Sequence, residues 1–159
     1  MRRLVKFLHT IGAIGLMGSM ATLTVLMHEV PPTTALAGYA LIYGAMAKIV
    51  GWIFLPALAL TLMPGLLAIG ITPAFHNAGW AWAKLATGVL VFEGCLVDIV
   101  GPIQEEARLS ASALAGHLNP TMLAGSAGGV RGSLWVMMVV ATANILLAIW
   151  RPRFTNLRD

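Results

Sequence analysis

The residues that could do chemistry in this sequence are ionisable side chains set inside long apolar stretches. They are His9, Lys48, Lys84, Glu93 and Asp98. An ionisable side chain is costly to place in the hydrocarbon region of a bilayer, so such residues usually pair, carry protons or bind a ligand. A neutral imidazole can ligate iron, and a buried carboxylate can bind or release a proton. We therefore look for a function among these five side chains.

The composition says that these residues are embedded in a membrane. Of 159 residues, 58% are hydrophobic and only 10% are charged, and the mean hydropathy is +0.85. A soluble domain carries about 25% charged residues because its surface faces water. The surface of this chain must itself be apolar, which makes the lipid bilayer its solvent. The length allows a single domain, residues 1–159.

The pattern of apolar runs and proline breaks predicts an all-α, integral membrane four-helix bundle. Pro31 and Pro32 end the first run, and Gly101–Pro102 ends the third. The run from Ala35 to Ile71 would measure roughly 55 Å as one helix, against a hydrocarbon core of about 30 Å, so we divide it at Lys48. The expected spans are 4–27, 49–70 with an interfacial helical extension at 35–48, 80–100 and 133–150. An extracytoplasmic loop is expected at 101–131, in which residues 104–116 could form a short surface helix.

The positive charges lie mainly at the two ends of the chain. Six of the ten Lys and Arg residues fall in the terminal segments, so the positive-inside rule predicts that both termini are cytoplasmic. We expect a multi-pass protein of a bacterial inner membrane. Basic residues that flank apolar spans are topology signals, and the net charge of +4 therefore does not predict nucleic-acid binding.

The assigned topology places His9 and Lys84 at a similar depth on the cytoplasmic side. Each lies only a few residues inside its span, so the two could face one buried site. The alternatives are a histidine hydrogen-bonded to a neighbouring helix and a lysine that extends to the headgroups. Gly12 follows His9 among small residues, which let a flat macrocycle or another helix approach closely. His28 is nineteen residues beyond His9, roughly 28 Å along the axis, so it cannot share that site.

Glu93 and Asp98 follow Lys84 in the same span, with Glu93 near the membrane midplane. A carboxylate there is either protonated or paired. Lys48 is the candidate partner of Asp98, and less easily of Glu93, so a structural ion pair and a proton-handling carboxylate both remain open. Asn144 in the fourth span is expected to make an interhelical hydrogen bond.

Several short motifs together resemble a known family. Lys6-Phe7-Leu8-His9-Thr10-Ile11-Gly12-Ala13, the run Pro64-Gly65-Leu66-Leu67 and the run Gly79-Trp80-Ala81-Trp82-Ala83-Lys84-Leu85 are similar to segments of the HemJ-type protoporphyrinogen oxidases. The chain also resembles a neighbouring family of small four-helix bacterial membrane proteins without an assigned function. A more distant similarity is to the CopD copper-resistance membrane domain.

The resemblance, over roughly residues 4–100, implies a b-type haem (haem b) held within the bundle. It implies that His9 ligates the haem iron, that Gly12 and Lys84 lie at the cofactor, and that Lys84 and Glu93 take part in catalysis. The implied activity is the oxidation of protoporphyrinogen IX, with electrons passed to a membrane redox partner in the respiratory chain. Glu93 stands where the HemJ type tends to carry a histidine.

Two other functions remain open. The chain could be a non-catalytic accessory or assembly subunit of a larger membrane complex, or form a homo-oligomer, through its small-residue faces. A small-solute or metal permease would need a polar path, which Lys48, Glu93 and Asp98 support only thinly. Walker, GxSxG, HExxH and CxxC motifs do not occur in the sequence.

Overall fold

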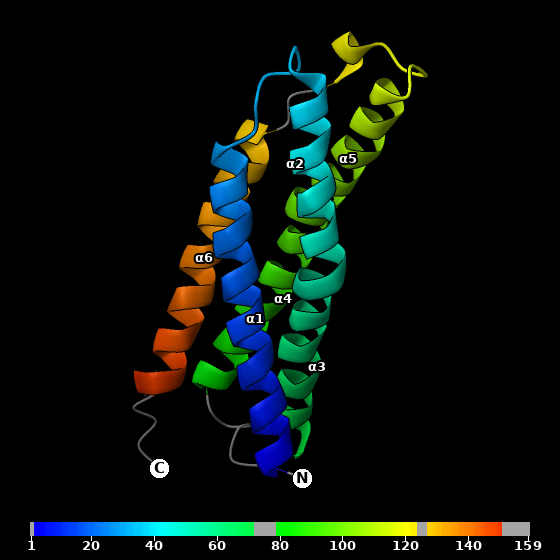
Figure 1. Cartoon of the computed structure of the whole chain (residues 1–159). Coiled ribbons are helices and arrows are strands. Elements are labelled where there is room, and N and C mark those ends of the chain that lie inside the picture. Colours follow the sequence, from blue (N-terminus) through cyan, green and yellow to red (C-terminus); the bar gives the residue numbers. More distant parts are fainter. Residues whose placement is uncertain (1, 72–78, 124–126, 151–159) are drawn as a thin grey trace, which may run out of the picture.

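The computed structural model describes residues 2–71, 79–123 and 127–150, and this part of the chain is almost entirely helical (Figure 1). The all-α class is confirmed, and four helices are long and apolar enough to cross a membrane. The elements are α1 (Arg2–His28), α2 (Leu36–Ile49), η1 (Val50–Phe54), α3 (Leu55–Ile71), α4 (Gly79–Cys95), η3 (Leu96–Val100), α5 (Gly101–Leu114), η4 (Pro120–Met122) and α6 (Ala127–Trp150).

The outer surface of the helices is apolar, as lipid contact requires. Large hydrophobic side chains are widely exposed, among them Trp52 at 82%, Leu41 at 72% and Met63 at 70%. Water would not tolerate so many contiguous apolar groups on a monomeric surface. The chain is a multi-pass membrane protein built as a helical bundle.

Two long helices share one irregularity, a π turn followed by a proline. In η1 the Leu55 N–H donates to Val50 O, and in η3 the Gly101 N–H donates to Leu96 O, so both bonds reach back five residues. In each case proline is the next residue, Pro56 or Pro102. A proline ring clashes with the carbonyl four residues back, and the wider π turn relieves this clash. The helices therefore bend without ending.

The irregular parts of the two long helices mirror each other in order. A 14-residue helix and a five-residue π turn precede α3, and a five-residue π turn and a 14-residue helix follow α4. No internal repeat is evident in the amino-acid sequence itself, so this correspondence belongs to the structure.

Two predicted boundaries are wrong. The helix does not end at Gly101–Pro102 but continues to Leu114, and α6 begins at Ala127, so most of the expected loop at 101–131 is helical. The chain is helical through Lys48, in keeping with the expected helical extension at 35–48, and the π turn begins two residues later. A proline that follows a π turn does not stop a helix, so a rule based on proline alone misplaces the end of the third span. Residues 72–78, between the second and third expected spans, and the basic residues of 151–159 lie outside the described residues.

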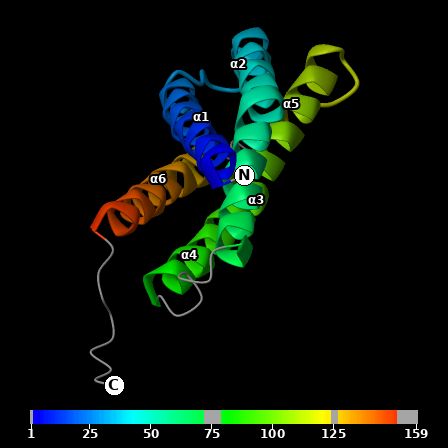
Figure 2. The same ribbon diagram turned by 90° about the horizontal axis from the view of Figure 1, so that it is seen from below.

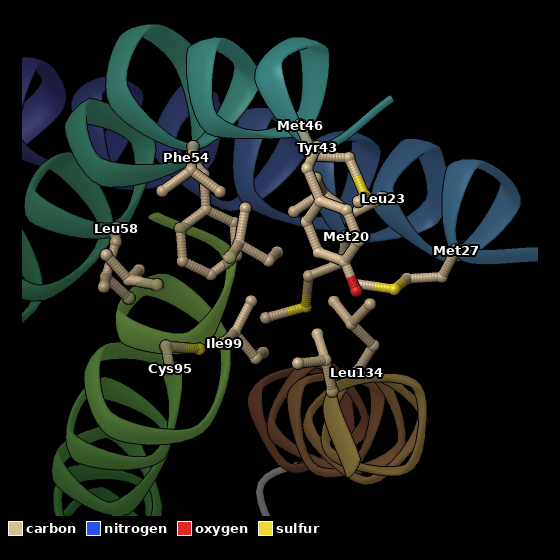
Figure 3. Packing of buried hydrophobic residues seen from close by; sticks show 14 of the residues in the cluster. Met20, Leu23, Met27, Tyr43, Met46, Phe54, Leu58, Cys95, Ile99 and Leu134 are labelled. Carbon is tan, nitrogen blue, oxygen red and sulfur yellow. The ribbon is translucent and has the colours of Figure 1, made fainter. Parts of the chain in front are cut away.

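The helices pack in pairs, α1 on α3, α2 on α5 and α4 on α6, with α1 also touching α6. Seen from below, α2 and α5 lie side by side on one side of the molecule, while α4 and α6 form the other (Figure 2). Near the π turns these pairs enclose a hydrophobic cluster, the packed core (Figure 3). Its labelled members are Met20, Leu23, Met27, Tyr43, Met46, Phe54, Leu58, Cys95, Ile99 and Leu134.

A buried polar pair joins α2 to α5 beyond the packed core. The Tyr39 hydroxyl donates to Glu106 Oε1 at 2.6 Å, and both residues are 2% exposed. Ile103, Glu106, Ser110 and Ala113 form the buried face of α5. We call this end of the bundle, near His28, Leu36 and Leu114, the packed end, and the opposite end, which holds the N-terminus, the cavity end.

Candidate ligand cavity

A cavity of about 640 Å³ lies at the cavity end, between α1, α3, α4 and α6. Sites for small molecules and cofactors measure about 300–1,000 Å³ and are mostly apolar with a few polar groups. This lining follows that pattern. Its polar side chains are Lys6, His9, Thr10, Thr61, Lys84 and Asn144.

The imidazole of His9 is held by a carbonyl of α3. His9 Nδ1 lies 2.6 Å from Thr61 O. Because a carbonyl oxygen only accepts, Nδ1 carries the proton and donates it, and in the neutral ring Nε2 keeps its lone pair. This is the tautomer in which metal-binding histidines are usually held, with the second nitrogen bonded to a backbone carbonyl.

Two glycines bring His9 to this carbonyl. A side chain at Gly12 would meet the backbone of Leu60 and Thr61 at 2.6 Å, so only glycine lets α1 lie this close to α3. A Cβ at Gly65 would lie 3.3 Å from two atoms of the His9 ring, so the ring rests directly on the α3 backbone. Pro64 precedes Gly65 and interrupts the hydrogen-bond ladder of α3 at this point. The Pro64–Gly65 pair therefore forms the part of α3 against which the His9 ring packs.

Lys84 comes to the same cavity from α4, and Lys6 from the first turns of α1. Lys84 is partly buried, whereas Lys6 is exposed. No carboxylate lines the cavity among the described residues, and neither lysine makes an ion pair there. The lining thus carries positive charge without a counter-charge, which favours an anionic ligand.

Asn144 closes the α4–α6 side of the cavity. Its Oδ1 accepts from the Thr87 hydroxyl at 2.7 Å, and its Nδ2 donates to Val140 O at 3.3 Å. The predicted interhelical hydrogen bond of Asn144 is confirmed. It ties α4 to α6, which the cavity would otherwise separate.

The other expected site residues lie elsewhere. Gly12 packs against α3 and does not line the cavity, and Glu93 is exposed on the outer face of α4. The ion pair expected between Lys48 and Asp98 does not form among the described residues, where both side chains are exposed. His28 does not line the cavity, and its Nδ1 bonds to Thr24 O of its own helix. The structure therefore brings together His9 and Lys84 alone of the expected group.

Three further members of this site, Lys6, Thr61 and Gly65, were not predicted from the sequence. Lys6 belongs to the terminal basic cluster, and Thr61 contributes its backbone carbonyl, so its residue type carries no signal. The dipeptide Pro64–Gly65 was a usable signal, because glycine after a helix proline marks a place where a neighbour can approach the backbone.

The described residues contain no group of three or more His, Cys, Asp or Glu side chains that could hold a metal ion. A haem iron needs only one or two protein ligands, because the macrocycle supplies the others. The donor set at His9 therefore fits a haem iron in a way that it does not fit a bare cation.

Scans against models of known protein families, curated proteins and solved structures found no match to this chain.

Proposed function

We propose that this protein binds a b-type haem in the cavity, with His9 Nε2 as an iron ligand, and acts as a membrane redox protein. The observation that carries the proposal is the orientation of the His9 imidazole ring. Its Nδ1 proton is committed to Thr61 O, which leaves Nε2 as the nitrogen available to a ligand in the cavity. The bond to the carbonyl also increases the basicity of the imidazole and fixes the plane of the ring.

The charge of the lining supports the same ligand. Haem b is a flat apolar disc with anionic propionate groups at one edge. The cavity offers apolar walls from four helices and the ammonium groups of Lys6 and Lys84. In this proposal the lysines pair with the propionates, and the disc occupies the apolar volume beside His9.

A bound haem would supply reversible one-electron oxidation and reduction. The residues of this chain would bind it, orient it and keep water away from its faces. The apolar lining lowers the local dielectric, and the axial ligand and surrounding charges tune the reduction potential. Lys84 would favour the reduced, less positive state of the haem, since it adds positive charge beside the propionates.

The wider biological setting belongs to the same proposal. The resemblance to HemJ-type proteins suggests protoporphyrinogen IX as electron donor and the respiratory chain as acceptor. The basic terminal segments favour a bacterial inner membrane with both termini in the cytoplasm. His9 and Lys84 would then lie in the cytoplasmic half of the bilayer.

The test is an absorption spectrum of the purified protein from cells supplied with a haem precursor. We expect a Soret band in the wild type that is lost in His9→Ala. His28→Ala is the matched control, since His28 is on the same helix and bonds only to its own turn. Lys84→Met should lower haem retention, while Lys48→Met, which alters an exposed lysine outside the cavity, should not.

A wild-type protein without a Soret band under these conditions would overturn the proposal. Co-purification with a larger membrane complex and without chromophore would instead support the accessory-subunit function. A Soret band that survives in His9→Ala but disappears in another variant would retain haem binding and refute the role of His9.

A further inference from the structure

The outward face of α4 is an apolar stripe with one carboxylate at its centre. Ala86, Val89, Leu90 and Glu93 of α4 and Val97 of the following η3 are all exposed, Leu90 at 63% and Val97 at 65%. The remaining faces of α4 are turned to the cavity, to α6 and to the packed core. Along the helix Glu93 lies one turn after Val89 and Leu90 and one turn before Val97, so it shares their surroundings.

The depth of Glu93 follows from its neighbour Gly94. A Cβ at Gly94 would lie against the side chain of Met137 in α6, so this part of α4 is level with the middle of α6. Met137 lies roughly 15 Å from Ala127 and roughly 20 Å from Trp150 along the axis of α6. Each distance is about half of a hydrocarbon core of about 30 Å or more, so the Glu93 carboxyl lies far from both headgroup regions.

Glu93 has no partner within its own chain among the described residues. The ion pair there is between Arg108 and Glu105, far along α5, and none of the side-chain hydrogen bonds involves Glu93. A carboxyl group that faces acyl chains at mid-depth is unfavourable unless another polar group covers it.

We propose that the α4 stripe is the interface of a parallel homodimer, in which Glu93 pairs with Glu93 of a second copy. Copies of one chain insert with the same orientation, so two facing α4 helices run parallel and bring equal residues to equal depth. A carboxylic acid both donates and accepts a hydrogen bond, so two glutamates that share a proton are complementary to each other.

The spacing along the stripe fits such a pair. Ala86, Leu90, Glu93 and Val97 follow one another at intervals of four, three and four residues. This is the 3.5-residue period of a left-handed helix pair, in which one polar residue in an apolar seam specifies register. Ala86 is small and lets the helices approach at the end nearer the cavity. The interface is separate from the cavity, because none of these four residues lines it.

Cysteine cross-linking in native membranes tests the geometry. Under a mild oxidant, Leu90→Cys and Val97→Cys should give disulfide-linked dimers. Val139→Cys on α6 and Ile14→Cys on α1 are matched controls, since these positions are 65% and 64% exposed on other helices and should remain monomeric. The native Cys95 is fully buried, so the unaltered chain should not cross-link.

Energy transfer between labelled copies in liposomes tests the role of Glu93. Glu93→Leu should weaken dimerisation about five- to thirtyfold, the effect of one interhelical hydrogen bond in lipid, whereas Glu93→Gln should keep it. Asp98→Asn is the control on the same helix. Equal cross-linking at Val139→Cys, no cross-linking at positions 90 and 97, or cross-links to a protein of different mass would overturn the proposal. Because these readouts do not need haem, they are independent of the proposed cofactor.

Discussion

The two ends of the bundle use the same transmembrane helices, yet one end encloses a cavity and the other is filled. At the packed end α1 contributes Met20, Leu23 and Met27, which interlock with Tyr43 and Phe54 (Figure 3). The cavity lining combines large side chains such as Leu62 and Leu85 with the small residues Ala13, Gly65, Ala81 and Gly88. These small residues leave volume between the helices that large side chains fill in the packed core.

The polar groups at the two ends differ in the same way. Tyr39 and Glu106 satisfy each other across the α2–α5 contact, so the packed end needs no ligand. At the cavity end His9 is bonded through one nitrogen only, and the lysines have no acidic partner among the described residues of the lining. The packed end is complete as a structure, whereas the cavity end has chemical groups left to bind something. The three substitutions that follow test this contrast, from the largest effect on stability to the smallest.

Phe54→Ala should be the most destabilising single change, by about 3–5 kcal/mol, because it removes a fully buried ring at the level of the π turns. Thermal or denaturant unfolding in detergent measures the loss. Phe7→Ala, at a residue 59% exposed to lipid, is the matched control and should change the free energy of unfolding little. Equal effects of the two would contradict the existence of a packed core at this level.

Tyr39→Phe should cost about 1–3 kcal/mol, because it leaves the buried Glu106 carboxyl without its donor. The double variant Tyr39→Phe, Glu106→Leu should recover most of this loss, since replacing both partners by apolar groups leaves no polar atom unsatisfied. Unfolding experiments on the single and double variants would show it. If the double variant loses as much stability as Tyr39→Phe and the single variant Glu106→Leu lose together, the two side chains are not coupled.

Gly88→Leu should leave stability nearly unchanged and abolish haem retention. A Cβ at Gly88 would meet nothing within 4 Å, and Gly88 lines the cavity, so a leucine there would extend into the volume of the ligand. The control is Gly70→Leu on α3, where a side chain also meets nothing within 4 Å and the position does not line the cavity. A Gly88→Leu protein that keeps a full Soret band would place the haem elsewhere.

The spans, their number and the level of His9 and Lys84 could be predicted because they depend on local properties. Hydropathy over some twenty residues sets a span, and a helix of constant rise sets depth along it. Both quantities are read along one element at a time. That is why His9 and Lys84 were expected to face one site before any contact was known.

The burial of Glu106 was not predicted, because nearby residues in the sequence are polar and exposed. Glu105 and Arg108 form an exposed ion pair beside it, and together with Gln104 they make the segment look like a polar loop. The usable signal was the period of Ile103, Glu106, Ser110 and Ala113, which places all four on one side of a helix. Glu93 shows the converse, since its apolar surroundings suggested an interior position and the structure places it outside.

The amino-acid sequence alone predicts a four-span helical membrane protein with costly polar residues at particular depths, because hydrophobicity and helix rise are properties of each segment. The direction in which those residues face depends on tertiary packing. That His9 turns to Thr61 and the cavity, while Glu93 turns to the outer surface of the bundle, depends on how α1, α3 and α6 pack around each helix. Packing is set by the fit between residues far apart in the chain, such as Gly12 against Leu60 and Gly94 against Met137.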